Sequence, residues 1–333
     1  MARLYFFLLV LLFAINCSAQ KIEVIEQGIH TNIRGMSVLN DRVAWVSGSN
    51  GYVGCSANGG KTWRWQQVKG YEKSDFRDIE AFSEKEAVII SSGTPALILR
   101  TTDGGATWKA CYRNEDKAYF LDAMDFKDSK HGYVLGDPID GKFMLLETTD
   151  GGTTWNEFAH RPDAVDGEAA FAASGTCFRI TGKSQLIIVT GGKATRVLTL
   201  QKAADHWHAD NLGVKTVKES KGAFSVNETG TIVVGGDYAS DKQTEETAFT
   251  RVENSSGWIE SKVLPAGFQS CVTNISKDIV LSTGTSGTNI STDGGISWKQ
   301  IVKESFNVCA KAKRGKLVLL AGANGRIALF KLY

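Results

Sequence analysis

A short glycine turn that ends in tryptophan recurs along the chain, most clearly as SANGGKTW, TTDGGATW, TTDGGTTW and STDGGISW. The tryptophans of these four turns and of two weaker copies are Trp63, Trp108, Trp155, Trp207, Trp258 and Trp298. They are spaced 45, 47, 52, 51 and 40 residues apart, which is the period of a four-stranded propeller blade rather than of a single catalytic loop. The repeat therefore predicts one closed ring, and 4 prolines with no low-complexity tract leave no obvious interdomain linker.

Seven segments begin with a run suited to the inner strand of a blade, and an apolar run rich in β-branched residues follows each of them. The predicted inner strands span residues 33–39, 76–82, 120–126, 169–174, 223–227, 268–272 and 306–310. Continuous apolar runs are expected for strands that neighbouring blades cover on both faces. The last segment stops at Tyr333 without a fourth strand, while residues 21–27 lie unpaired ahead of the first blade. We therefore predict an all-β fold over residues 20–333, a single seven-bladed β-propeller closed by an N-terminal strand.

The repeated turns are predicted to be structural. The aspartate or asparagine can accept hydrogen bonds from backbone amides of its own turn, the glycines permit positive φ, and the tryptophan can wedge between blades. The positions with this role are Asn58 and Trp63, Asp103 and Trp108, Asp150 and Trp155, and Asp293 and Trp298. A calcium loop needs more carboxylates, and a phosphate-binding glycine turn runs into a helix, so no ligand is predicted at these turns.

Residues 1–19 have the pattern of a secretory signal. Arg3 is followed by a short apolar run and then by small residues, with cleavage predicted after Ala19. Cys17 loosely resembles the cysteine of a bacterial lipoprotein signal, but Asn16 stands where a small residue is wanted, so lipidation is the less favoured alternative. No later run is long and apolar enough for a transmembrane segment. We expect a secreted or periplasmic protein, and a monomer.

Composition and motifs exclude several function classes. A net charge of +2 argues against nucleic acid as a partner. The chain after Ala19 keeps an odd number of cysteines, which cannot form a complete disulfide framework, and it has no dinucleotide-binding, haem-attachment or C-x-x-C motif, so no cofactor is predicted. His206 and His208 with Asp210 could form a metal pair, but we favour rim residues and predict no metal site.

The turns resemble Asp boxes, and the order of the segments around them is similar to that of a known family. The segments concerned include SNGYVGCSANGGKTW, GTPALILRTTDGGATW, GDPIDGKFMLLETTDGGTTW and VVGGDY. They resemble the Asp-box (BNR-like) family of exported bacterial proteins related to the photosystem II stability and assembly factor, over nearly the whole mature chain. The resemblance implies a seven-bladed propeller and, from the photosynthetic members, an assembly role. Bacterial relatives are often labelled oxidoreductases, and photosystem assembly is not carried over because the chain has no plastid transit peptide.

Polar residues that the strand pattern does not require are the candidates for a binding site. They lie on or beside inner strands, or near the loops that follow second strands, and could form one mixed-charge funnel around the channel. The candidate residues are Arg34, Arg77, Asp78, Asp122, Asp137, Glu168, Arg196 and Asp237. Arg34 and Arg77 occupy the same place in successive inner strands, so both guanidinium groups could hold a carboxylate ligand or an acidic peptide tail. The alternative is that these charges neutralise one another and retain water. The polar insertion of residues 237–248 is a further candidate recognition segment.

We therefore predict a binding or assembly module that acts through its channel face on an envelope or secreted protein, or on a small acidic or glycan ligand. No catalytic residue is predicted, and an enzyme is the less favoured class. The alternative is a carbohydrate-active hydrolase or lyase that uses carboxylates at the channel mouth, Asp137 with Glu168 or Asp237.

Overall fold

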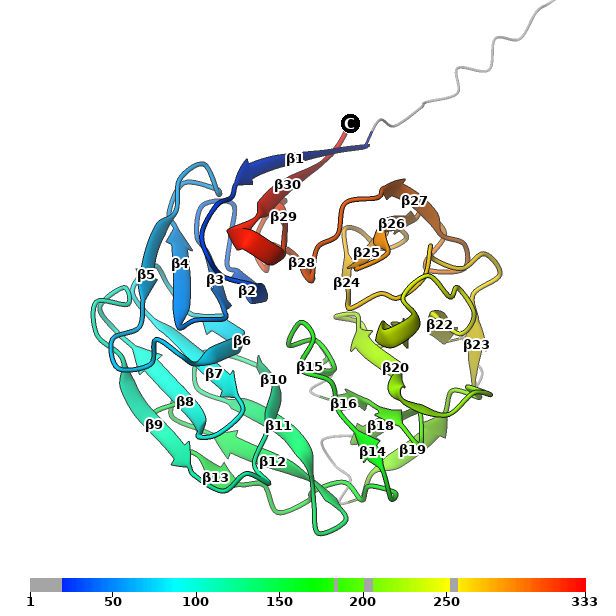
Figure 1. The fold of residues 1–333 in the computed structure, drawn as a ribbon, viewed down its shortest axis with the longest axis horizontal. Helices are drawn as coiled ribbons and strands as arrows, with labels where there is room; N and C mark the ends of the chain where they lie inside the picture. Colours follow the sequence, from blue (N-terminus) through cyan, green and yellow to red (C-terminus); the bar gives the residue numbers. More distant parts are fainter. Residues whose placement is uncertain (1–19, 183–184, 201–205, 252–256) are drawn as a thin grey trace, which may run out of the picture.

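The computed structural model of the protein describes residues 20–182, 185–200, 206–251 and 257–333. Seven β-sheets stand around a central axis, as Figure 1 shows. The predicted all-β, seven-bladed propeller is therefore confirmed. Two short 3-10 turns are also present, η1 (Tyr238–Ser240) and η2 (Ala323–Gly325). The predicted signal sequence, its cleavage after Ala19 and the alternative lipidation of Cys17 lie outside the described residues.

The first three blades follow the chain from the inner strand outward. Blade 1 contains β2 (Ile33–Val38), β3 (Ala44–Gly48), β4 (Tyr52–Ser56) and β5 (Arg64–Gln67). Blade 2 contains β6 (Asp75–Ala81), β7 (Ala87–Ser92), β8 (Ala96–Thr101) and β9 (Lys109–Asn114). Blade 3 contains β10 (Leu121–Phe126), β11 (Gly132–Ile139), β12 (Lys142–Thr148) and β13 (Asn156–Glu157).

The next three blades keep this order. Blade 4 contains β15 (Phe178–Ile180), β16 (Leu186–Val189), β18 (Arg196–Leu200) and β19 (His208–Asn211). Blade 5 contains β20 (Lys218–Val226), β21 (Ile232–Asp237), β22 (Ala248–Arg251) and β23 (Trp258–Glu260), and its sheet is extended by β14 (Glu168–Ala169) and β17 (Gly191–Gly192). Blade 6 contains β24 (Cys271–Asn274), β25 (Val280–Gly284), β26 (Gly287–Ser291) and β27 (Lys299–Val302).

The last blade joins the two ends of the chain. It contains β28 (Val308–Lys311), β29 (Val318–Ala321) and β30 (Ile327–Leu332), and β1 (Gln20–Glu26) supplies its outer strand. β1 runs antiparallel to β30, with Gln20 opposite Leu332 and Val24 opposite Ala328. Figure 1 shows the blue and red ends of the chain side by side in this sheet. The predicted closure by an N-terminal strand is confirmed, and it removes the open edge that β30 would otherwise present.

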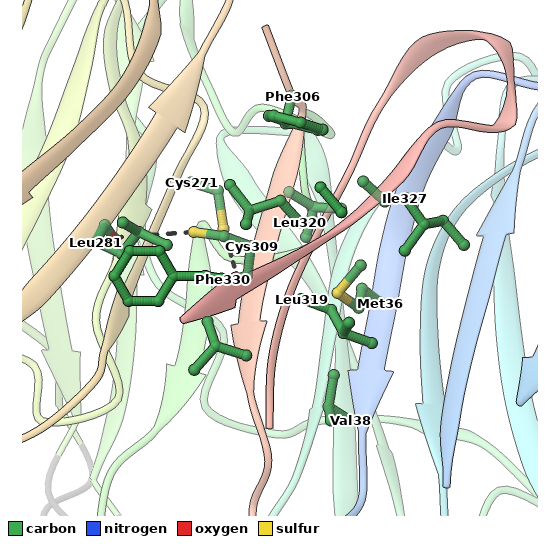
Figure 2. Packing of buried hydrophobic residues seen from close by; sticks show 14 of the residues in the cluster. Met36, Val38, Cys271, Leu281, Phe306, Cys309, Leu319, Leu320, Ile327 and Phe330 are labelled. Carbon is green, nitrogen blue, oxygen red and sulfur yellow. Dashed lines mark hydrogen bonds between the residues drawn. The ribbon is translucent and has the colours of Figure 1, made fainter. Parts of the chain in front are cut away.

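The core lies between blades, where apolar strand faces pack together. Figure 2 shows one such cluster, in which side chains of β24, β28, β29 and β30 meet those of β2. Cys271 and Cys309 occupy matching places on adjacent inner strands and are both buried free thiols. The Cys271 thiol donates to the backbone oxygen of Cys309 at 3.3 Å, and the Cys309 thiol donates weakly to that of Leu281 at 3.8 Å. Both therefore behave as small core residues.

In all four clear copies of the turn, the aspartate or asparagine Oδ1 accepts from the backbone N–H of the residue four positions later, and Asp150 illustrates this geometry. Its Oδ1 accepts from the backbone N–H groups of Thr153 and Thr154 at 3.0 and 2.9 Å, and its Oδ2 accepts from the Thr154 hydroxyl at 2.7 Å. Trp155 donates its ring N–H to the backbone oxygen of Gly152, which has a φ of +84°. The carboxylate thus supplies the acceptors that the exposed turn backbone would lack, and no ligand is needed to hold the turn.

The sequence prediction is wrong at the inner strand of the fourth blade. Residues 169–174 were expected to form it, but β15 (Phe178–Ile180) does, and the residues before it leave the sheet. We call residues 170–176 the channel segment. The segment contacts inner strands of several blades, through Ala123 of blade 3, Ser225 of blade 5 and Ser270 ahead of blade 6. In Figure 1 the green loop beside β15 reaches the middle of the ring.

Candidate functional site

The channel segment divides the bore into two recesses. We call the larger one, about 550 Å³, the arginine recess; Arg34, Arg77, Asp122, Asp137, Phe171 and Tyr238 are among its lining residues. The smaller one, about 270 Å³, is the opposite mouth; Asp78, Glu80, Arg179, Glu228, Lys311 and Lys313 are among its lining residues. β6 begins at the first recess and ends at the second. The candidate residues therefore do not gather in the predicted single funnel. Those that line the arginine recess are Arg34, Arg77, Asp122 and Asp137, whereas Asp78 lines the opposite mouth.

Asp78 lies in the opposite mouth, where it joins two blades. Its Oδ1 accepts from the backbone N–H of Ile79, and its Oδ2 accepts from that of Met124 in the next blade, both at 2.8 Å. Asp125 repeats this contact one blade further on, with Oδ2 accepting from the N–H of Ile180 at 2.8 Å. Both oxygens of Asp78 are occupied, and burial raises the pKa of its carboxyl well above the usual range. Asp78 is therefore a link between inner strands rather than a ligand-binding residue.

Glu168 and Arg196 form an ion pair beside the arginine recess. The Arg196 Nε donates to Glu168 Oε1 at 2.8 Å, its Nη2 contacts Oε2, and the Thr190 hydroxyl also donates to Oε1. Glu168 is 4% exposed, so the pair holds β14 against its neighbours rather than facing a ligand. The carboxylate expected to act with Asp137 is thus already neutralised.

Asp237 is also occupied by its own surroundings. It caps η1 by accepting from the N–H of Ala239 at 3.0 Å, and it accepts from Lys218 Nζ at 2.8 Å and the Ser220 hydroxyl at 2.7 Å. These contacts lower the pKa of its carboxyl to about 2 against the effect of burial. They also fix the start of the 237–248 insertion, whose far end is held by an ion pair between Lys221 and Glu246 at 2.6 Å.

The two arginines lie side by side on the floor of the arginine recess. Arg34 donates from Nη1 to the backbone oxygen of Ala173 at 3.1 Å, and Arg77 donates from Nη1 to that of Ala172 at 2.8 Å. Arg77 is also paired with Asp75, whose Oδ2 lies 2.7 Å from its Nε. Consecutive carbonyl groups of the channel segment therefore hold the two guanidinium groups in place. Each guanidinium group has further N–H groups that bond to no residue the structure describes.

Arg34 differs from Arg77 in having no acidic partner. Within the described ranges, its only hydrogen bond is the one to Ala173, and no carboxylate lies within ion-pair distance. Burial, and next the positive charge of Arg77, lower the pKa of Arg34 to about 10. A guanidinium group remains charged at that pKa at neutral pH, so Arg34 is a positive charge with no acidic partner within ion-pair distance among the described residues.

Two carboxyl groups form another wall of the same recess. Asp122 is fully buried, and its oxygens make no hydrogen bond to any residue that the structure describes. Burial raises its pKa well above the usual range and the neighbouring Asp137 raises it further, whereas Arg77 and the nearby Ala172 N–H lower it. Asp137 accepts from the Ala170 N–H at 3.2 Å, and burial raises its pKa to about 6. Burial therefore favours the uncharged form of Asp122, whereas Asp137, with a pKa of about 6, is mostly ionised at neutral pH.

An aromatic cluster borders the arginines, and sequence reasoning missed it. Phe171 stacks on Phe224 with centroids 3.9 Å apart, Tyr238 meets both rings edge-on, and Phe268 packs against Phe224 at 4.7 Å. Tyr238 is 55% exposed, so the cluster reaches the surface. One available signal was the phenylalanine at or near the start of several predicted inner strands, Phe120 and Phe268 among them. The channel segment brings Phe171 onto Phe224, which the blade period does not show.

Other candidate sites receive less support from the geometry. Within the described residues, no three His, Cys, Asp or Glu side chains come together as potential metal ligands. His208 instead contacts Asp210, with Nε2 and Oδ1 2.9 Å apart. The described part of the chain also has no helix whose length and apolarity would suit a membrane crossing.

The sequence matches the predicted family over its N-terminal third. Residues 15–116 match the family described as photosynthesis system II assembly factor YCF48, and residues 290–300 match the BNR/Asp-box repeat. The predicted resemblance to Asp-box propellers related to this factor is therefore confirmed. A comparison with curated proteins found no match.

Solved structures share the fold at low sequence identity. A structure of YCF48 bound to D1 peptide is 17% identical, with a TM-score of 0.67 over 93% of this chain and 96% of that one. Virginiamycin B lyase from Staphylococcus aureus is 11% identical, with a TM-score of 0.68 over 95% and 100%. A GH74 xyloglucanase from Xanthomonas campestris is 14% identical, with a TM-score of 0.61 over 93% of this chain and 53% of that one. Such likeness shows the fold alone, because one propeller scaffold carries unrelated functions.

Proposed function

We propose that this chain is an exported binding or assembly module that holds a carboxylate-bearing segment of a protein partner in the arginine recess. The observation that carries the proposal is the guanidinium group of Arg34, partly buried beside Arg77 and without an acidic partner in the described part of the chain. A carboxylate between the two forks would supply the missing counter-charge and accept their unused N–H groups. The recess volume, about 550 Å³, is within the range of ligand-binding sites.

The likeness to an assembly factor supports a protein-binding role. YCF48 has been solved with a D1 peptide bound, so one propeller of this architecture binds a polypeptide segment. For this chain we propose the general role and not that partner. The signal-like residues 1–19 favour an envelope or secreted protein as the partner, and a secreted or periplasmic location for the propeller.

A carbohydrate-active hydrolase or lyase is the second candidate, and one observation favours it. Asp122 and Asp137 line one recess and interact, and the pKa of Asp137 is raised to about 6, as the pKa of a general acid often is. Against it, Glu168 and Asp237, the partners expected for Asp137, are taken by Arg196 and by Lys218. Asp122 is itself covered, which leaves one accessible carboxyl group where glycoside hydrolysis generally uses two.

The experiment compares binding and hydrolysis by the same purified protein. Peptides with a free carboxylate and their amidated forms would be titrated against the parent chain, the Arg34→Ala, Arg77→Ala double variant, and Arg113→Ala, an exposed arginine of β9 paired with Glu115. We expect the double variant to lose at least tenfold in affinity for the acids, while Arg113→Ala and the parent bind alike.

Two results would contradict the proposal. Equal affinity of the parent and the double variant would remove the arginine pair from the site. Hydrolysis of a glycan panel by the parent chain, abolished in Asp137→Asn, would favour the enzyme instead.

A further inference from the structure

The aromatic cluster and the arginine pair both contact the same short stretch of the channel segment, residues 171–173. Arg34 and Arg77 are held by the carbonyl groups of Ala173 and Ala172, and the ring of the preceding residue, Phe171, belongs to the aromatic cluster. All of these residues line the same recess. The cationic and aromatic parts of the recess are therefore within one or two residues of each other along the channel segment.

The aromatic part has a fixed framework with an accessible edge. Phe224 and Phe268 are 3% and 4% exposed and pack behind the front rings. Phe171 lies flat on Phe224, with 5° between the ring planes, so its orientation is set by a buried neighbour. Tyr238 stands edge-on to both on η1, which Asp237 caps. Rings held in this way lose little freedom when a ligand arrives, because they are ordered already.

An apolar surface in the same recess as a guanidinium group without an acidic partner among the described residues restricts which ligands fit there. Arg34, Phe171 and Tyr238 line one recess of about 550 Å³, so a ligand whose carboxylate is held by Arg34 also meets the aromatic part of that recess. A polar substituent there would give up water without gaining a hydrogen bond from the rings of Phe171 and Phe224. A planar apolar substituent would instead gain edge-to-face contacts of the kind that Tyr238 already makes.

We propose that the aromatic cluster is a side-chain subsite that selects a polypeptide segment with an aromatic residue next to its bound carboxylate. This rests on the proposed function, because it takes the carboxylate to be held by Arg34 and Arg77. Phe171 and Tyr238 contact the ligand ring, and Phe224 and Phe268 support them. The subsite determines which partner segment binds, while the arginines supply the common anchor.

The test uses four dye-labelled or acetylated probes, measured by fluorescence polarisation and competition. They are Gly-Gly-Gly-Phe with a free carboxylate, Gly-Gly-Gly-Ala with a free carboxylate, the amide of the first, and N-acetylphenylalanine. We expect the parent chain to bind the phenylalanine acid about tenfold more tightly than the alanine acid, and the amide more weakly than either.

The variants separate the subsite from the anchor. Tyr238→Ala removes a 55% exposed ring, so it should fold. We expect it to weaken binding of the phenylalanine acid more than binding of the alanine acid, which narrows the tenfold preference to about threefold. Tyr238→Phe keeps the ring and should retain the full preference. Phe171→Leu, with folding checked by thermal melting, should also weaken the preference.

Each result tests a different part of the proposal. Equal affinity for the phenylalanine and alanine acids would overturn the aromatic subsite and leave the carboxylate anchor standing. Failure of every acid to bind would overturn the proposed function and this inference together. Binding of N-acetylphenylalanine as tight as that of the tetrapeptide would overturn a polypeptide as the source. A preference unchanged in both Tyr238→Ala and Phe171→Leu would place the selecting surface elsewhere.

Discussion

At the scale of single residues, the carboxyl groups around the bore differ in the partners that hold them. Asp78 accepts two backbone N–H groups, Glu168 is paired with Arg196, and Asp122 has no hydrogen-bond partner among the described residues. In the sequence these are similar acidic residues near similar strands. Their spacing in the sequence predicts that they lie near the channel. It does not show which of them already have hydrogen-bond or ion-pair partners, because those partners come from other parts of the ring.

The raised pKa of Asp137 gives a stability prediction with a definite sign. The folded state holds this proton up to about pH 6, whereas an unfolded aspartate releases it near 3.8, so the free energy of unfolding falls as pH rises through this window. Asp137→Asn keeps the acceptor for the Ala170 N–H and removes the charge. We expect the variant to be more stable than the parent by about 1 to 3 kcal/mol at pH 8 and no more stable below pH 4.

Urea unfolding of the parent and Asp137→Asn at pH 4, 6 and 8 would measure this difference. A difference that stays constant across these pH values would contradict the assigned ionisation of Asp137.

The Glu168–Arg196 pair should matter for folding and not for binding. Glu168→Ala leaves the guanidinium group of Arg196 without its buried partner, and we expect a loss of about 3 kcal/mol in the free energy of unfolding. Asp166→Ala is the matched control. Asp166 pairs with Lys193 and its side chain is 97% exposed, so we expect this variant to change the free energy of unfolding by less than about 0.5 kcal/mol. Equal chemical-denaturation midpoints for the two variants would show that the Glu168–Arg196 pair contributes nothing to stability.

At the scale of structural elements, the repeat predicted most strands and failed where the chain departs from it. The inner strand of blade 4 is only three residues long, Phe178–Ile180, too short for an alternating pattern to be visible. The apolar run ahead of it resembled a strand, but Gly175 has a φ of +69° and turns the chain across the bore. The bore is too narrow at this point for a side chain at position 175, because a Cβ on Gly175 would come within 2.2 Å of the Asp78 carboxyl carbon.

The turn of blade 3 offers a test of how the repeat is stabilised. Asp150→Ala removes the acceptors for Thr153 and Thr154, and we expect a loss of about 1 kcal/mol, since water can replace part of these bonds at the surface. Asp150→Asn should cost less, because Asn58 serves the first turn, with Oδ1 accepting from the Thr62 N–H at 3.0 Å and Nδ2 donating to its hydroxyl at 2.8 Å.

The same pair of variants has a pH signature. The turn lowers the pKa of Asp150 to about 2, so its contribution is present above pH 4 and is lost as pH falls towards 2. Asp150→Asn should lack this acid-sensitive part in thermal melts between pH 5 and pH 2. A melt of Asp150→Asn that follows the parent at every pH would mean that the carboxylate charge is irrelevant to the turn.

At the scale of the whole molecule, closure depends on the first strand. A chain beginning at Gly28 would lose β1, and with it Ile22 and Ile25, which pack against the core, and it would leave β30 as an exposed edge. We expect its free energy of unfolding to fall by roughly 3 kcal/mol or more, from lost burial alone, with aggregation through the free edge. Denaturant unfolding and light scattering would compare it with a chain that begins at Gln20.

Glu23→Ala is the control for this truncation, because it removes an exposed contact with Lys331 and keeps the strand. If the chains beginning at Gln20 and Gly28 were equally stable, closure would not depend on β1.

The ring and its closure were predictable from the sequence because both follow from a period and an unpaired end. The arginine pair was found for the same reason, since Arg34 and Arg77 hold equivalent places in successive blades. The division of the bore and the aromatic cluster were not predictable, because Phe171 and Ala172 meet residues of distant blades through a segment that breaks the period.

The channel segment lies across the bore of the ring and separates its two recesses. Ala172 and Ala173 face the arginine recess, while Ser174, Gly175 and Thr176 line the opposite mouth, so the two compartments are separated by one thickness of backbone. The bore of this propeller therefore has two recesses with a common base, and a substitution in that base alters both of them at once.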